Sequence, residues 1–322
     1  MHPRFALTIS PDEAVVRDLA AREPENLFIT PAFMHGLKLR GFTPCLLTVV
    51  EGGKVLQGCL GAWKTGRLSS SLDIRMLPDL PAGSPFWKGL QVACKRLGAW
   101  DLTIYAVTTG PDPIPPLGPV SFCESGIEYH LPMGADPVPL PTSSNLRRNI
   151  SKAQKSGLVL HRTSSRDATP FHVGLMGSSL ERRKERGEHI AGNAQYRYYE
   201  DMLAAGAGEF FQAVDASGTV LSSVFFLRSA AAAYYQSAGT SAEGMSLGAS
   251  AFLIWSAAET LRKEGVTKFC LGGSTLDNTG LVRFKSGFGG VEVPFYSKGI
   301  SMASPVKSRF REWLRKLKIG SA

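Results

Sequence analysis

The chain repeats one order of expected elements, and this repeat restricts its fold more than any other feature. In the first copy, apolar β-rich runs over 46–63 flank a glycine-containing turn at 51–54, the pattern of an antiparallel hairpin. A strand-like run at 67–76 follows, then apolar residues at helical spacing over 86–97 and a short strand at 101–107. The first half thus predicts the order strand, turn, strand, strand, helix, strand.

The second copy follows two helical stretches, at 167–186 and 193–205. Its expected strands lie at 209–214, 220–227, 232–237 and 268–271, with a helix at 246–264 before the last of them. A short helix at 280–286 and a strand at 291–299 complete this half. The sequence therefore predicts an α/β (α+β) fold of two similar domains, each with a mixed, largely antiparallel sheet flanked by helices.

Two stretches rich in proline and glycine mark the boundary between the halves. Residues 110–119 and 132–141 exclude helix, because proline lacks the amide hydrogen that a helix needs and clashes with the preceding turn. We expect an N-terminal domain over 1–130 and a C-terminal domain over 140–303. The remaining residues, 304–322, are expected to form a basic amphipathic helix.

Composition narrows the class of protein and of partner. Lys and Arg number 36 against 27 Asp and Glu, so the net charge of 36 − 27 = +9 favours anionic partners such as phosphates, nucleic acid or an acidic membrane surface. Five widely spaced cysteines in mostly apolar runs indicate buried thiols in a reducing compartment. The N-terminus lacks the apolar core of a signal peptide, and no stretch reaches the ~20 apolar residues that span a bilayer, which predicts a cytoplasmic protein.

Two segments carry a resemblance to a known family. The run Arg147-Arg-Asn-Ile-Ser-Lys-Ala-Gln-Lys-Ser-Gly157 is similar to an Arg-Arg-x-Ile-x-Lys-Ala-x-Lys-x-Gly helix. The runs Leu271-Gly-Gly-Ser274 and Phe284-Lys-Ser-Gly-Phe-Gly289 are similar to a strand-ending Gly-x-Ser followed by Phe-Lys-x-x-Phe-Gly. Both motifs are typical of the Fem-type aminoacyltransferases, a branch of the GNAT superfamily. Together with Tyr234-Tyr-Gln-Ser-Ala-Gly-Thr240, the resemblance covers residues 140–300.

The resemblance implies a fold and an activity. Fem-type proteins are twin GNAT folds, in which two acyl-CoA N-acyltransferase-like domains face each other across a substrate cleft, and they attach amino acids to peptidoglycan precursors. We therefore expect an N-acyltransferase that takes an acyl or aminoacyl group from acyl-CoA or aminoacyl-tRNA. This donor is a co-substrate, with no permanently bound cofactor expected. The expected acceptor is an amine of a nucleotide- or lipid-linked sugar peptide of the cell envelope.

The expected catalytic residues are Lys285 and Phe284. Acyl transfer to an amine places negative charge on the carbonyl oxygen, so a fixed cation near that oxygen lowers the barrier. The resemblance implies that this Phe-Lys pair serves one end of the cleft, with Lys285 near donor phosphate or developing charge. The alternative is a surface lysine beside a core phenylalanine, the common situation for lysine outside such a motif.

Donor phosphates have two expected binding places. The helix 145–156 presents Arg148 and Lys152 on one cationic face with Arg147 at its margin, although such a face is more often solvated surface. The turn 244–251 enters a helix, where unpaired backbone amides attract anions. The expected contacts there are Ser246 and Gly248, while Ser250 stands where the GNAT signature has a second Gly or Ala. An ordinary capped helix packed on a sheet is the alternative.

The expected substrate- or cofactor-binding set is completed by Tyr235, Ser274 and Arg283. For the proton that the attacking amine must lose, Tyr234, Tyr235 and Asp277 are open candidates. The histidines His172 and His189 have no matching partner and are expected to be surface or structural residues. Since neither a nucleophile triad nor metal-ligand spacing is apparent, we expect direct transfer without a covalent intermediate or a metal.

The segment 304–318 bears on a competing reading of function. Its apolar side chains Phe310, Trp313, Leu314 and Leu317 share one helical face among six basic residues. Such a helix could contact tRNA or the inner face of a membrane, or pack on its own domain. The competing reading is a non-catalytic basic module on a GNAT scaffold that docks RNA or an anionic membrane through 145–166 and 304–318.

Overall fold

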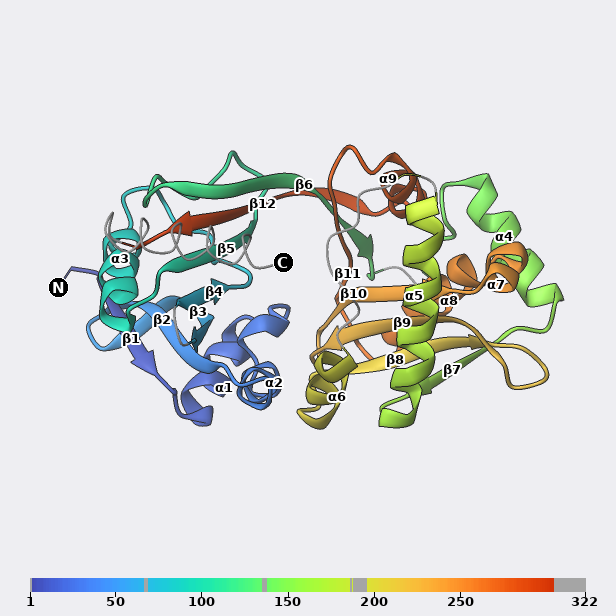
Figure 1. The fold of residues 1–322 in the computed structure, drawn as a ribbon, viewed down its shortest axis with the longest axis horizontal. Coiled ribbons are helices and arrows are strands. Elements are labelled where there is room, and N and C mark those ends of the chain that lie inside the picture. Colours follow the sequence, from blue (N-terminus) through green and yellow to red (C-terminus); the bar gives the residue numbers. More distant parts are fainter. Residues whose placement is uncertain (1, 67–68, 135–137, 186, 188–195, 304–322) are drawn as a thin grey trace, which may run out of the picture. The chain divides into compact units, whose positions relative to one another are not determined.

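The computed structural model describes residues 2–303 apart from 67–68, 135–137, 186 and 188–195. The chain divides into two compact units (Figure 1). Unit 1 contains Met1–Asp12, Gly41–Ser125 and Phe295–Ala322, and unit 2 contains Glu13–Arg40 and Gly126–Pro294. The expected C-terminal helix at 304–322 lies outside the described residues.

Unit 1 is a mixed sheet with one helix crossover. Its elements are β1 (Arg4–Ile9), β2 (Thr43–Glu51), β3 (Lys54–Thr65), β4 (Ser70–Ile74), α3 (Pro85–Leu97), β5 (Asp101–Val107) and the last residues of β12 (Val291–Ser301). The strand order is β1-β2-β3-β4-β5-β12, and all neighbours are antiparallel except β4 and β5. Helix α3 connects this parallel pair. The Ser84 side chain accepts from the Phe86 amide at its start, and Gly98 ends it at φ +63°.

Unit 2 repeats this plan with more helices. Its strands are β6 (Val120–Pro132, from Gly126 on), β7 (Val159–Thr163), β8 (Gly208–Val214), β9 (Val220–Arg228), β10 (Ala232–Thr240), β11 (Lys268–Ser274) and the start of β12. Its α-helices are α1 (Glu13–Arg22), α2 (Pro31–Leu39), α4 (Ser144–Lys155), α5 (Thr169–Glu185), α6 (Tyr196–Ala204), α7 (Ala242–Leu247), α8 (Ala249–Lys263) and α9 (Thr279–Ser286). Short 3₁₀ turns lie at Leu27–Ile29 and Arg166–Ala168.

The sheet of unit 2 has the order β6-β11-β10-β9-β8-β7, with β10 and β11 as its parallel pair. Helix α8 makes the crossover between them, as α3 does in unit 1. The predicted repeat of an antiparallel sheet with one helix crossover is thus confirmed. The helix expected at 246–264 is two helices, because Gly248 at φ +77° interrupts the helical backbone between α7 and α8.

Helices cover both faces of the unit 2 sheet (Figure 1). On one face, Ile150 of α4 and Leu253 of α8 share a core with Phe211 and Phe226 of the sheet. On the other face, Tyr199 of α6 packs edge-on against Phe225, with 5.1 Å between ring centroids. Burial of apolar area on both faces is the main force that holds these layers together.

Residues 13–40 pack in unit 2, whereas the predicted division assigned them to a domain over 1–130. The Phe28 ring lies 5.4 Å from the Tyr234 ring, centroid to centroid. A Cβ on Gly36 of α2 would lie 2.6 Å from Met202 Sδ of α6, so this glycine permits the close approach of the two helices. Unit 1 in turn takes its last strand from 295–301.

Candidate functional site

The parallel strands β10 and β11 pair over only three residues and then separate. Residues 232–234 pair with residues 268–270, and beyond them β10 stays with β9 while β11 stays with β6. A register shift follows in each strand, after Tyr235 in β10 and after Cys270 in β11. Such bulges bend a strand and disrupt its ladder, which is consistent with the separation at this point.

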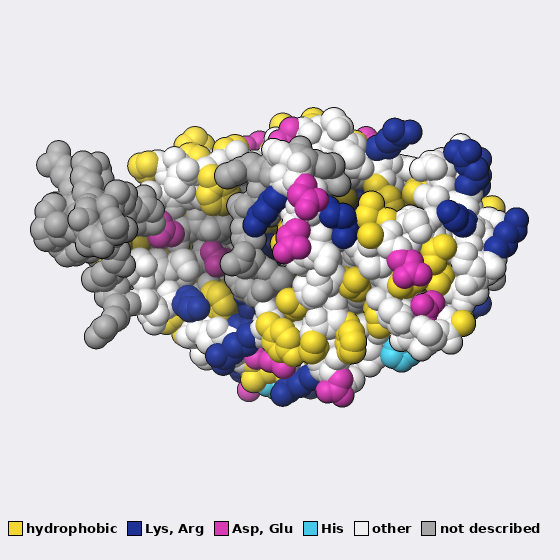
Figure 2. Space-filling view, turned by 45° about the vertical axis from the view of Figure 1, so that its right-hand side comes forward, with side chains coloured by type: hydrophobic (Ala, Val, Ile, Leu, Met, Phe, Trp, Pro, Cys, Tyr) yellow, Lys and Arg dark blue, Asp and Glu magenta, His cyan; other side chains and the backbone are white. Residues whose placement is uncertain are grey.

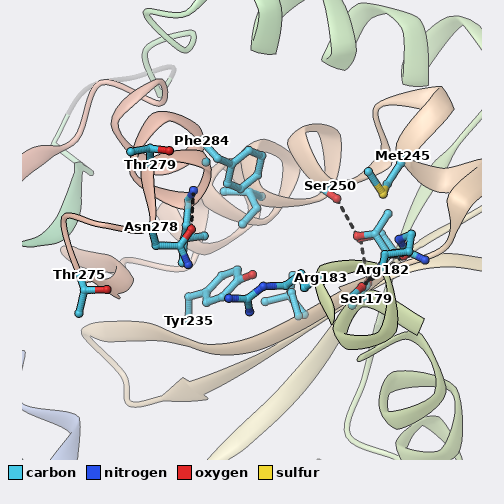
Figure 3. Close-up of a pocket in the computed structure, with 18 of the residues that line it drawn as sticks. Ser179, Arg182, Arg183, Tyr235, Met245, Ser250, Thr275, Asn278, Thr279 and Phe284 are labelled. Carbon is cyan, nitrogen blue, oxygen red and sulfur yellow. Dashed lines mark hydrogen bonds between the residues drawn. The ribbon is translucent and has the colours of Figure 1, made fainter. Parts of the chain in front are cut away.

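A pocket of about 860 Å³ opens where these strands separate. Figure 3 shows Tyr235 of β10 and Phe284 of α9 facing it, with Ser179, Arg182 and Arg183 at the α5 wall. The side chains of Met245 and Ser250 border it from α7 and α8. The lining combines apolar surface with a few polar groups, as is typical of small-molecule sites.

A chain of hydroxyl groups forms one polar side of the pocket. Ser222 Oγ lies 2.9 Å from Thr240 Oγ1, which lies 2.7 Å from Ser250 Oγ. The Ser250 hydroxyl, at the position where the GNAT signature has Gly or Ala, is therefore bonded to the sheet. Helix α8 starts at Ala249 without a side-chain cap, so its first amide groups are not satisfied by a capping side chain.

The arginines of α5 were missed by sequence reasoning. The Arg182 guanidinium donates to Ser179 Oγ, at 3.1 Å, and to the Thr240 carbonyl, while Arg183 lines the pocket. Both lie in the last turn of a helix, where basic side chains are usual because they complement the helix dipole. Only the packing of α5 on β10 distinguishes them from solvated charges.

Lys285 lies in the interior of unit 2 and is only 4% exposed. Its ammonium donates to the Gly273 carbonyl at 2.8 Å and lies 5.4 Å from the centroid of the Tyr235 ring. Burial lowers the pKa of Lys285 to about 8, while the charges of Cys270 and Glu128 act in the opposite direction. Among the two expected catalytic residues, Phe284 lines the pocket and Lys285 does not.

The two side chains leave α9 in different directions, because consecutive residues of a helix point about 100° apart around its axis. Phe284 faces the pocket, while the Lys285 side chain is directed to the carbonyl of Gly273. Tyr235 connects the two positions, because it lines the pocket and its ring also lies beside the lysine. Gly272, at φ +72°, leaves room for this arrangement, since a Cβ there would lie 2.9 Å from the Tyr235 carbonyl and 3.6 Å from Lys285 Nζ.

A buried carboxylate, Glu128, lies in the same region and has no exposed surface. The Tyr234 hydroxyl donates to its Oε1 at 3.0 Å, and the Cys270 thiol donates to its Oε2 at 3.2 Å. His130 Nε2 lies 3.0 Å from the same Oε2. The polar atoms of Glu128, His130 and Cys270 gather within 4.8 Å. Sequence spacing gave no sign of this cluster, because β6 and β11 meet only in the folded sheet.

The other expected binding residues lie mostly away from the pocket. Arg147 donates to the carbonyls of Pro141 and Thr142, at 2.7 and 2.8 Å, and Lys152 donates to the carbonyl of Ser246 at 2.6 Å. None of the exposed side chains Arg147, Arg148, Lys152, Ser246 and Arg283 lines the pocket. The cationic face of α4 is thus used in part to fix the chain before it and the turn of α7.

The remaining predicted residues divide between pocket and core. Buried Ser274 stands next to Thr275, which lines the pocket together with Asp277, one of the candidate bases. A Cβ on Gly248 would lie 2.5 Å from the Asn149 carbonyl oxygen, so this glycine brings α4 and the start of α8 together.

Of the two histidines without an expected role, the structure describes only His172. His172 is buried between Ser223 Oγ and Ser237 Oγ, each 3.0 Å from one ring nitrogen, and burial lowers its pKa to about 3. A neutral imidazole in such a place is structural, as predicted. His189 lies outside the described residues.

Surface charge and helix length bear on the competing reading. On the face drawn in Figure 2, Lys and Arg side chains form several separate groups with acidic and hydrophobic side chains between them. None of the helices in the described part of the chain is long and apolar enough to cross a membrane. The segment 304–318, on which that reading depends in part, is outside the described residues.

Comparison with known proteins identifies the domain and the fold. Residues 142–286 match the model of the acetyltransferase (GNAT) domain family. No curated protein matches the sequence. Among solved structures, FemX is similar, with 13% identity and a TM-score of 0.65 over 92% of this chain and 97% of that one.

Two further structures share the fold at similar identity. A tandem GNAT protein from the clavulanic acid biosynthesis pathway is 15% identical, with a TM-score of 0.58 over 94% of this chain and 99% of that one. The L-PGS protein of Bacillus licheniformis is 13% identical, with a TM-score of 0.54 over 93% of this chain and 95% of that one. The expected twin GNAT architecture is confirmed, and the chain is an acyltransferase that carries a GNAT domain at residues 142–286 within a Fem-like tandem GNAT fold.

Proposed function

We propose that the protein transfers an acyl or aminoacyl group from an activated donor to an amine of a sugar- or peptide-linked precursor of the cell envelope. The observation that carries this proposal is the pocket between the separated strands β10 and β11, lined by Tyr235 and Phe284 and bordered by the start of α8. The likeness of the fold to FemX supports a cell-envelope acceptor.

For the donor we propose a CoA thioester. Its pyrophosphate would bind at the first turn of α8, which has no side-chain cap and whose Ser250 lines the pocket. Lys152 holds the carbonyl of Ser246 and so fixes the turn that leads into this helix. The acyl chain would extend along the pocket toward Tyr235 and Phe284. An aminoacyl-tRNA is the alternative donor that the experiment below distinguishes.

In the transfer step the amine nitrogen attacks the acyl carbonyl carbon, the new C–N bond forms and the C–S bond of the thioester breaks. Positive charge near the oxyanion lowers the barrier, and we assign this role to Lys285, which acts from behind Tyr235. The amine loses one proton, for which Asp277 in the pocket is the proposed acceptor. The departing thiolate takes up the proton from Asp277, so the protons balance. Burial raises the pKa of Tyr235, so its phenol stays protonated and can only donate a hydrogen bond in the pocket.

The donor is tested by native mass spectrometry with acyl-CoA and aminoacyl-tRNA offered separately, followed by transfer to a nucleotide-linked sugar peptide. Retention of acyl-CoA and formation of an amide product are the expected results. Retention of aminoacyl-tRNA alone would replace the CoA thioester by the tRNA ester as donor. Failure to transfer from either donor would contradict the proposed function.

The role of Lys285 is tested by Lys285→Met, with exposed Lys263→Met on α8 as the control. Removal of one charge-stabilising group typically costs about 3 kcal/mol of barrier, which is ~100-fold in rate. We expect this loss in kcat for Lys285→Met and an unchanged rate for the control. Undiminished transfer by a folded Lys285→Met protein would remove this residue from the mechanism.

A further inference from the structure

We propose that Glu128 is the counter-charge that keeps the buried Lys285 ammonium protonated, and that it therefore acts as a positioning residue for the transfer step. This inference rests on the proposed function, because it concerns the protonation state of the residue assigned to the oxyanion. Glu128 does not line the pocket, so its influence acts through Lys285.

The sheet register brings the two charges together. Gly273, whose carbonyl accepts from the Lys285 ammonium at 2.8 Å, is the register partner of Glu128 in the β11–β6 ladder. His130 is the partner of Cys270 and lies two residues after Glu128, hence on the same face of β6. The ammonium is therefore anchored on the strand position directly opposite the carboxylate.

Hydrogen bonds favour the ionised form of Glu128. The carboxylate is fully buried and accepts from Tyr234 on one oxygen and from Cys270 on the other, with His130 Nε2 also at 3.0 Å from the second oxygen. A buried carboxylate without such partners would be neutral, because burial in a medium of low polarity disfavours charge. Donors on both oxygens offset that cost.

Glu128 supplies the carboxylate whose charge acts on Lys285. The groups that face the ammonium are Tyr235 from β10, Cys270 from β11 and Glu128 from β6. A negative charge on Cys270 or on Glu128 would raise the pKa of Lys285, but burial raises the pKa of the Cys270 thiol well above its usual value and so disfavours its charged form. Burial raises the pKa of the Tyr235 phenol in the same way. On α4, the Arg147 guanidinium is directed to the carbonyls of Pro141 and Thr142.

The consequence concerns activity near neutral pH. Burial already lowers the pKa of Lys285 to about 8, and the charge of Glu128 acts against this lowering. Without that charge, a substantial share of Lys285 would be neutral at pH 7 and would offer no positive charge to an oxyanion. Glu128 thus raises the pH at which Lys285 loses its proton.

The test is the titration of Lys285, followed through its side-chain ¹³Cε signal and assigned by the loss of that signal in Lys285→Met. In Glu128→Gln the midpoint is expected to fall by about one pH unit, the usual effect of removing a nearby opposite charge. The matched control is Glu124→Gln, which removes an exposed carboxylate from the same strand and should leave the midpoint unchanged. An unchanged midpoint in Glu128→Gln overturns the inference.

A reciprocal measurement keeps the test decisive if Glu128→Gln does not fold. Coupling between two titrating groups is the same seen from either side, so Lys285→Met should raise the pH at which the Glu128 carboxyl signal titrates. No change there also overturns the inference. The rate of transfer separates the two proposals. If kcat is unchanged in Lys285→Met while the titrations of Lys285 and Glu128 are coupled, the proposed role of Lys285 in transfer fails and the charge pairing stands.

Discussion

Replacement of Lys285 by methionine removes a buried charge while keeping a side chain of similar length. We expect the variant to be more stable than the parent protein at pH 7, although it loses activity. Active sites often hold groups that cost stability, because the chemistry needs them where the fold would not place them. The Lys285 side chain is 4% exposed, so solvent screens its charge little.

The magnitude follows from the pKa of this residue. A lowering from 10.5 to about 8 means that the folded protein bears a cost for the ammonium, which at ~1.4 kcal/mol per pKa unit is about 3 kcal/mol. Methionine avoids that cost but loses the hydrogen bond to the Gly273 carbonyl, worth ~1 kcal/mol. The net gain expected for Lys285→Met at pH 7 is therefore about 2 kcal/mol.

The sign of the pH dependence is fixed by linkage. Between about pH 8 and 10.5 the unfolded chain holds a proton on Lys285 that the folded chain has released, so the free energy of unfolding of the parent rises with pH. Below pH 8 both states are protonated, and the residue adds no pH dependence. The stability advantage of Lys285→Met should accordingly be constant up to pH 8 and then shrink as pH rises.

The assay is urea denaturation of parent and variant at a series of pH values from 7 to 10, with the difference taken so that all other titrating groups cancel. Lys263→Met serves again as the control and should show no such difference. A variant less stable than the parent at pH 7, or a stability gap that is the same at pH 7 and pH 10, would refute this reasoning.

Two further predictions concern glycine geometry and a buried histidine. Gly248→Ala should weaken retention of acyl-CoA and lower the free energy of unfolding by roughly 2–4 kcal/mol, because its Cβ would lie 2.5 Å from the Asn149 carbonyl oxygen at φ +77°. The control Gly218→Ala, at φ +86° with nothing within 4 Å, carries the backbone strain alone and should cost only ~1 kcal/mol and leave donor binding intact. Equal effects of the two variants would contradict the close approach. Burial lowers the pKa of His172 from its ordinary value of 6.5 to about 3, so the parent protein should lose ~1.4 kcal/mol of unfolding free energy per pH unit as pH falls below 6.5. His172→Gln should lack this slope in acid denaturation. If the unfolding free energies of parent and variant fell in parallel with pH, the imidazole would have to be protonated in the fold.

Local signals made much of the fold predictable. Helices α3 and α4 stand where the sequence indicates helices, at 86–97 and 145–156, and the structure shows the first ending at Gly98 and the second capped by Ser143. These features depend on neighbours in the chain, which sequence reasoning can see. The packing of residues 13–40 in unit 2 was not predictable in this way. It depends on contacts such as that of Gly36 with Met202, a residue far along the chain that local sequence does not reveal.

The site was predictable in part for the same reason. The Phe284-Lys285 motif pointed to the correct helix, and Tyr235 and Phe284 line its pocket. That Lys285 turns away from the pocket, and that Glu128 lies within its electrostatic reach, depends on the register between β6 and β11. Burial of two charged side chains together is the opposite of what their residue types suggest on their own.

The interleaved chain has a consequence for biosynthesis. Because each compact unit gathers segments from distant parts of the sequence, a nascent polypeptide cannot finish either one early. The strand that completes unit 1 is finished only at residue 301, when all of unit 2 has already been translated. Both units should therefore mature late, and the edge of β5 stays open to chaperones, or to aggregation, until then.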